Sequence, residues 1–281
     1  SRQNVLDLLT LRRSISTIDV DDDSTADLSG TDVHYQGFSL GTLSAQAFVA
    51  VANDATQGDT SDDISTSFFS TPGGGISRFL ENSPAFAPSI LNGLGLSAGL
   101  TADTSSYQAY MNVLQASLDS FDAINFVGDY EDQGTTVLYV EAVNDTLIPV
   151  SPNTEERTLK AEAGTQVFAI NTLAIGGQTA AVKFDGSISH LAGAEPLVTE
   201  SNATAIESAT AGVVIDRNVI RLAPGEATHF GPCDDAAKLE FGGWQFGLAV
   251  TGAIAVSAET ASDRIQTLPL PALEPTRACF F

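Results

Sequence analysis

The chain has 281 residues, 43% of them hydrophobic, which is enough to bury a sizeable core in one large or two small domains. Its 35 Asp and Glu residues against 12 Lys and Arg residues give a net charge of −23. That charge argues against nucleic acid or an anionic membrane surface as a partner and suits a secreted or saline setting. Cys233 and Cys279 are compatible with one disulfide, as in an oxidising compartment, or with two free thiols.

Apolar residues at helical spacing predict a helix over residues 2–18. Arg12 and Arg13 stand towards its C-terminal end, where positive charge favours the helix dipole. We expect this helix to pack beside the strand that follows it in the chain.

An acidic segment comes next and has the alternating pattern of a calcium-binding loop, in which every second residue turns an oxygen towards one cation. The candidate ligands are the carboxylates of Asp19, Asp21, Asp23 and Asp27 and the carbonyl of Thr25. Two positions depart from the EF-hand pattern, since Ser24 stands where the sharp turn favours glycine and Gly30 where a glutamate would close the shell. A structural calcium site and a solvated acidic turn both remain open.

A strand-like run from Val33 ends in Gly37-Phe38-Ser39-Leu40-Gly41, and a small-residue apolar run suited to a helix covers residues 42–52. A serine between two glycines at this spacing, after a strand and before a helix, is typical of the nucleophile elbow of α/β-hydrolases, where the glycines let the backbones cross closely. We predict Ser39 as a nucleophile and the Leu40 N–H as an oxyanion donor. The alternative is a chance match of a short pattern.

Residues 64–70 predict the next core strand, and Pro72-Gly73-Gly74-Gly75 then breaks the sheet. Beyond it the pattern changes to short amphipathic segments at residues 76–80, 87–100 and 107–121. Apolar helices inserted between core strands suit a lid over a lipid-binding cleft, but the same pattern serves ordinary packing helices.

A strongly apolar run at residues 136–143 predicts a buried strand and leads directly to Asp145. A carboxylate just past a strand end is where the acid of a Ser-His-Asp triad belongs, because there it can accept the second N–H of the histidine. We predict Asp145 as this acid. The alternative is an Asn-Asp turn that only ends the strand.

The chain has three histidines, so the general base can be sought by elimination. His34 lies inside the strand before Ser39 and is predicted to be a core residue or to stand behind the residues that react. Spacing from Asp145 favours His190. His229 follows strand-like runs at residues 213–215 and 218–222, whereas residues 178–184, before His190, form a predicted hairpin with residues 165–175. We predict His229 as the base, with His190 as the alternative.

These residues together resemble the extracellular and surface lipases and phospholipases of Gram-negative bacteria, the virulence-factor lipase family. The matching pieces are residues 2–11 before an acidic loop, Gly37 to Gly41, Val143-Asn144-Asp145 with Ile148-Pro149, residues 191–197, and Gln245-Phe246. The resemblance places residues 191–197 between the acid and the histidine, which supports His229 over His190.

Three departures from the family pattern bear on the substrate more than on the reaction. Phe38 stands where the family usually has histidine, Thr42 replaces a glycine, and Phe230-Gly231 replaces a glycine-serine pair. Family members also carry a long N-terminal region, and only one predicted helix precedes the elbow here. We therefore expect the upstream strands to come from an N-terminal fragment or second chain, or the fold to be a shortened variant.

The sequence thus predicts an α/β-hydrolase core, a mostly parallel sheet flanked by helices, with a helical lid. Residues 1–72 would form the first part of the core, 73–128 the lid, 129–256 the remainder with a hairpin insertion, and 257–281 a tail. The expected function is hydrolysis of water-insoluble or acyl esters by a secreted or surface-exposed bacterial enzyme that needs no cofactor for catalysis. The alternative is a non-catalytic extracellular module stabilised by calcium.

Overall fold

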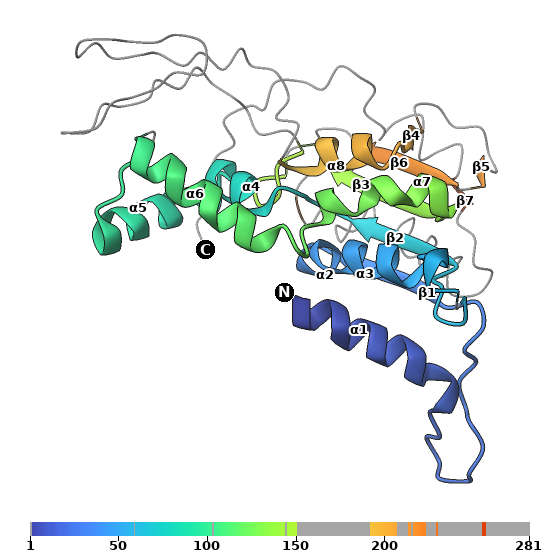
Figure 1. The fold of residues 1–281 in the computed structure, drawn as a ribbon. Helices are drawn as coiled ribbons and strands as arrows, with labels where there is room; N and C mark the ends of the chain where they lie inside the picture. The colour runs from blue at the N-terminus through green and yellow to red at the C-terminus, as the bar shows by residue number, and fades with distance from the viewer. Residues whose placement is uncertain are drawn as a thin grey trace, which may run out of the picture.

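A computed structural model of the chain describes residues 2–58, 60–102, 104–143, 145–150, 192–206, 213–214, 216–222, 229 and 255–256 (Figure 1). Several sequence-based predictions fall outside these residues and stay predictions. They concern the hairpin at residues 165–184, His190, both cysteines, Gln245-Phe246 and the tail at residues 257–281.

The main sheet has five parallel strands in the order β1-β2-β3-β6-β4 (Figure 1). Their bounds are β1 His34–Phe38, β2 Thr66–Ser70, β3 Val137–Ala142, β4 Thr204–Ala205 and β6 Arg217–Leu222. Two short strands, β5 Val213–Val214 and β7 Ala255–Val256, form a separate antiparallel pair. The prediction of a parallel α/β sheet is confirmed, and its parallel strands place their carboxyl ends along one edge of the sheet.

One face of the sheet packs against helices α1 (Arg2–Ser14), α3 (Ala45–Ala52), α7 (Tyr130–Gln133) and α8 (Ala194–Glu200). The side chains of Phe69, Tyr139 and Val219 lie in this core. The opposite face is buried as well, through Phe68, Leu138 and Ile220. Burial on both faces explains why β3, whose residues are all buried, reads as a nearly continuous apolar run without alternation.

Helix α1 continues into the short turn η1 (Ile15–Thr17), which confirms the helix predicted over residues 2–18. The buried side chain of Arg12 donates hydrogen bonds to the carbonyls of Asp63 and Gly30. Burial lowers the pKa of Arg12. This arginine ties the acidic loop to the end of the first helix.

The helix predicted over residues 42–52 is divided in two, α2 (Leu40–Leu43) and α3. The division falls at Ser44, whose side-chain oxygen accepts a hydrogen bond from Asn4 of α1. All residues of α3 except Val51 are buried. Its small side chains let the helix lie close behind the sheet.

Helices α4 (Ile76–Asn82), α5 (Ala87–Ala98) and α6 (Ser105–Leu118) occupy the three segments predicted as a lid, and they lie together where β2 and β3 end (Figure 1). Asp122 fixes the start of α4, because its carboxylate accepts the N–H groups of Gly75 and Ile76 at 2.9 and 2.7 Å. No side chain of α5 is buried.

The remaining connections are the short turns η2 (Ala55–Gln57), η3 (Ala123–Asn125) and η4 (Val127–Asp129). The described part of residues 187–210 holds both α8 and the short strand β4. Among the described residues, no helix is both long enough and apolar enough to cross a bilayer.

Candidate active site

Ser39, His229 and Asp145 form a continuous hydrogen-bonded chain. The Ser39 hydroxyl lies 2.7 Å from Nε2 of His229, and Nδ1 of His229 lies 2.6 Å from Oδ2 of Asp145. Ser39 directly follows β1, Asp145 follows β3, and His229 lies beyond β6 in the chain. The three side chains meet because parallel strands end at the same edge of a sheet.

Ser39 has backbone angles of φ 52° and ψ −119°, which non-glycine residues rarely adopt. Such strain costs on the order of 1–3 kcal/mol and persists only where the surroundings enforce it. Here the Ser39 N–H donates to the Ser70 carbonyl at 3.0 Å, and the Thr42 N–H donates to the Ser39 carbonyl at 2.8 Å. The tight strand-to-helix turn expected for a nucleophile elbow is therefore present.

The two glycines of the motif have different roles. A Cβ at Gly37 would lie 2.8 Å from the backbone oxygen of Gly41, so only glycine fits where the strand passes the start of α2. A Cβ at Gly41 would meet nothing within 4 Å. The prediction that both glycines are needed for close backbone crossing is right for Gly37 and wrong for Gly41.

The Asp145 carboxylate is buried and held by its own turn. Its Oδ1 accepts the N–H groups of Leu147 and Ile148 at 2.8 and 2.9 Å, which leaves Oδ2 for His229. Nδ1 of His229 therefore donates to Asp145, and Nε2 is left as the acceptor for the Ser39 hydroxyl. This is the tautomer that a general base for serine requires.

The imidazole of His229 is only 2% exposed. The ring of Phe38 packs against it, with centroids 5.3 Å apart and the planes inclined by 55°. Phe38, one of the three departures from the pattern of the family that the sequence resembles, thus contacts the predicted base directly.

Leu40 begins α2, and the N–H of a first helical residue has no partner inside its own helix. This N–H comes directly after Ser39 in the chain, as an oxyanion donor must. The Leu40 side chain is largely exposed, so an apolar group stands beside the nucleophile.

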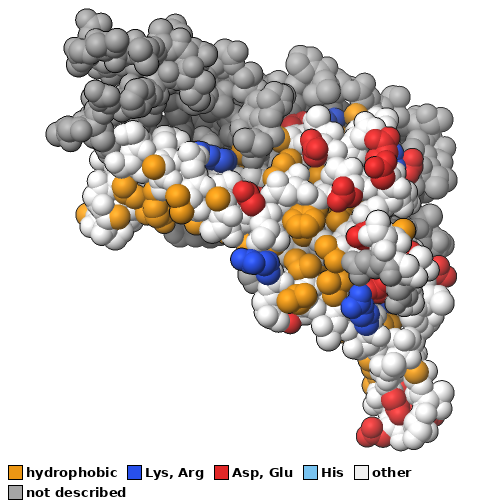
Figure 2. All heavy atoms as spheres, in the orientation of Figure 1, with side chains coloured by type: hydrophobic (Ala, Val, Ile, Leu, Met, Phe, Trp, Pro, Cys, Tyr) orange, Lys and Arg blue, Asp and Glu red, His pale blue; other side chains and the backbone are white. Residues whose placement is uncertain are grey.

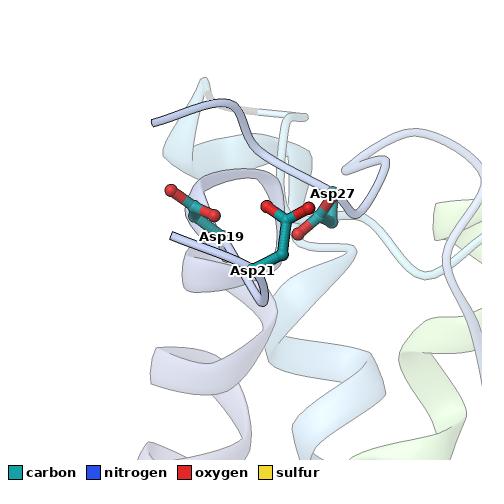
Figure 3. A group of neighbouring side chains, drawn as sticks. All are labelled: Asp19, Asp21 and Asp27. Carbon is teal, nitrogen blue, oxygen red and sulfur yellow. The ribbon is translucent and has the colours of Figure 1, made fainter. Parts of the chain in front are cut away.

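The acidic loop brings three of its carboxylates together. Oxygens of Asp19, Asp21 and Asp27 lie within 4.8 Å of one another (Figure 3). Asp23 does not belong to this group, and its Oδ1 accepts the N–H of Thr25 at 2.8 Å. These contacts neither support nor exclude calcium, so the ion stays a prediction.

A second cluster of charged groups was missed by sequence reasoning. Glu141 of β3, Arg221 of β6 and Glu195 of α8 are buried together beneath α8. A glutamate near the end of an otherwise apolar strand was the available signal, because such a buried group requires a partner.

His34 lies on β1 and is half-buried, with an Nδ1 atom that is buried and without a hydrogen-bond partner. It does not belong to the hydrogen-bonded chain of Ser39, His229 and Asp145. The prediction that His34 lies in the core is therefore wrong, whereas the prediction that it is not the base agrees with this position.

No protein-family model, curated protein or solved structure matches this chain.

Proposed function

We propose that this chain is a serine ester hydrolase with an α/β-hydrolase core, related to the virulence-factor lipases of Gram-negative bacteria. The single observation that carries the proposal is the chain of hydrogen bonds from Ser39 through His229 to Asp145. The strained backbone of Ser39 is a second, independent support, because such strain collects at functional positions.

In the proposed reaction, Ser39 Oγ attacks the ester carbonyl while Nε2 of His229 takes the hydroxyl proton. The negative charge that develops on the carbonyl oxygen is stabilised by the Leu40 N–H. His229 then returns the proton to the departing alcohol, which leaves an acyl group on Ser39. Water, deprotonated by the same imidazole, hydrolyses this ester and restores the serine. Asp145 holds the imidazole in the required orientation throughout.

The exposed apolar residues of helices α5 and α6 favour a water-insoluble ester as the substrate. Asp103 is the only charged residue between Asn82 and Leu118, in a chain whose net charge is −23. Large apolar side chains stand exposed on these helices, including Leu96 at 82% and Val113 at 71% exposure, and hydrophobic side chains gather over them in Figure 2. An uncharged apolar surface beside the site suits the acyl chains of neutral esters, and α4 to α6 are accordingly proposed as the lid.

A second candidate concerns completeness of the site. Among the described strands, β1 pairs only with β2, so one edge of the strand that precedes the nucleophile has no partner in the described part of the chain. An open edge can accept a further strand. In this second candidate, an N-terminal fragment or a second chain pairs with this edge of β1 and supplies a further oxyanion donor.

Two further proposals are carried over from the sequence. The acidic composition suits a secreted or surface location, and the loop of Asp19, Asp21 and Asp27 is proposed to bind structural calcium. A rise in the unfolding temperature on adding calcium, absent with Asp21→Asn, would support the latter, and no rise would count against it.

The proposed activity is tested by turnover of p-nitrophenyl esters over short and long acyl chains. Ser39→Ala is expected to abolish turnover, whereas Ser67→Ala, which removes a buried hydroxyl from β2, is expected to leave it unchanged. Activity that survives Ser39→Ala would contradict the proposal. If the wild-type chain gains activity only when an N-terminal fragment is added, the second candidate is favoured.

A further inference from the structure

The buried charged cluster connects the two strands that carry the predicted acid and base. Glu141 of β3 and Arg221 of β6 are paired across the parallel ladder. Arg221 Nε lies 3.2 Å from the Glu141 carboxylate, and Arg221 holds both oxygens of Glu195, with Nη2 donating at 2.9 Å. All three side chains are almost fully withdrawn from solvent.

Glu195 belongs to the first turn of α8, and this turn is attached to the segment that follows Asp145. The N–H groups of Ala194 and Glu195 donate to the carbonyls of Pro149 and Val150 at 3.3 and 2.9 Å. The preceding residue, Gly193, exchanges two backbone hydrogen bonds with Gly74, at 2.9 and 3.0 Å. Helix α8 therefore fixes the position of the acid loop.

Arg221 lies near the end of β6, and the chain continues from this strand to His229. The Arg221 guanidinium is thus linked to the segment after Asp145 through Glu195 and α8. It is linked to His229 through its own strand, β6, from which the chain continues to this histidine. The hydrogen bond between Asp145 and His229 depends on the distance between the segment that follows β3 and the segment that follows β6.

Stability alone is a weak reason for such a cluster. A buried ion pair is often no more stabilising than apolar side chains of similar volume, because desolvation offsets the attraction between the charges. Its specific property is geometry, since two parallel hydrogen bonds from a guanidinium fix both distance and orientation.

We infer that Arg221 and Glu195 are positioning residues that hold the acid loop and the base-bearing strand in register, so that Asp145 meets His229. This inference rests on the proposed function. It extends that function by assigning a role in the reaction to two residues that do not touch the substrate.

The test measures kcat and KM for a p-nitrophenyl ester with Glu195→Gln, Arg221→Met and the double variant. Each kcat is divided by the number of serines that a fluorophosphonate labels at completion, which removes the effect of unfolded protein. We expect kcat per labelled site to fall about 10- to 100-fold, with KM changed less than about three-fold, because a small misplacement of catalytic groups slows the chemical step. The double variant should lose no more than either single variant, because the pair acts as a unit.

Arg217→Met is the matched control. It makes the same change on the same strand, but Arg217 lies at the start of β6 and pairs only loosely with Glu131 and Asp216, at 3.6 and 3.7 Å. Its kcat per labelled site should equal that of the wild type. Arg221→Lys is added because it keeps a positive charge in the buried site while it cannot hold both carboxylate oxygens, and a smaller fall in kcat is expected.

Unchanged kcat per labelled site in Glu195→Gln, or in Arg221→Lys if the first variant does not fold, would overturn the inference. So would an equal fall in Arg217→Met. Failure of the proposed function is a separate result, since the wild-type chain would then neither label nor turn over.

Discussion

At the scale of single residues, the placement of the reactive side chains depends on the backbone conformation at a few positions. Ser39 is held in an unfavourable conformation, and the strand before it must pass very close to the start of α2. The space at Gly37 is set by backbone atoms, which cannot move aside as the end of a flexible side chain can.

Gly37→Ala and Gly41→Ala make the same chemical change on either side of the nucleophile. A methyl group at Gly37 would lie 2.8 Å from the Gly41 oxygen, whereas at Gly41 it would enter open space. We expect Gly37→Ala to lower stability by about 1–3 kcal/mol and to displace Ser39. Gly41→Ala should leave both turnover and the unfolding free energy close to wild type. Equal effects of the two variants would contradict this account of the elbow.

Asp145→Asn tests the role of the acid. An asparagine can present its NH2 group to Nδ1, which favours the wrong imidazole tautomer, and in serine proteases the same change lowers kcat about 10⁴-fold. We expect a fall of similar order here, measured by ester turnover.

Asp122→Asn is the control for that variant, because Asp122 is also buried and its carboxylate accepts the backbone N–H groups of Gly75, Ile76 and Ile124. It should cost on the order of 1 kcal/mol of unfolding free energy, as the loss of a helix cap does. If Asp122→Asn lowers kcat as much as Asp145→Asn does, a general loss of packing explains both effects, and the tautomer of His229 does not.

At the scale of elements, α5 is unusual because it has many apolar residues and buries none of them. Its neighbour α6 buries Tyr107 and Met111 but leaves Val113 exposed. Exposed apolar surface of this extent marks an interaction site more often than it marks ordinary packing.

Leu96→Asp combined with Val113→Asp should therefore lower hydrolysis of long-chain esters presented as an emulsion. Turnover of a dissolved short-chain ester should change little, because neither side chain belongs to the Ser39–His229–Asp145 chain. Leu6→Asp on α1, another exposed leucine, is the control and should affect neither substrate. The account of these helices as a lid fails if both substrates, or neither, respond to the double variant.

Periodicity and strand ends were enough to predict most of the described elements, together with Ser39 and Asp145, which each follow a predicted strand. His229 required elimination among three histidines, with His190 left as an alternative, and the family resemblance in its favour. The division at Ser44 could not be predicted, since it depends on a contact with Asn4 from a distant helix. Helix α8 was missed as a clear element because all its residues up to Val198 are buried, and this removes the amphipathic pattern.

At the scale of the whole molecule, the buried cluster makes stability depend on pH. Burial, and then the nearby charge of Glu195, raise the pKa of Glu141 well above its ordinary value of 4.5. At a pH between 4.5 and the raised pKa of the folded protein, Glu141 still holds a proton that the same side chain has released in the unfolded chain. The contribution of Glu141 to the unfolding free energy therefore falls as the pH rises above about 4.5, by up to about 1.4 kcal/mol per pH unit for one proton.

Glu141→Gln removes this titration while keeping the shape of the side chain. Its unfolding free energy, measured in urea from about pH 5 upwards, should fall less steeply with pH than that of the wild type. Identical slopes in the two proteins would mean that Glu141 is ionised in the folded state.

The central claim is that Ser39 is a nucleophile activated by His229 and Asp145, and intact-mass spectrometry after reaction with a fluorophosphonate tests it most directly. The account predicts one adduct per folded chain, mapped to Ser39 by peptide analysis and greatly slowed by His229→Ala. A folded, monodisperse sample that takes up no probe, or takes it up at another residue, would contradict the claim.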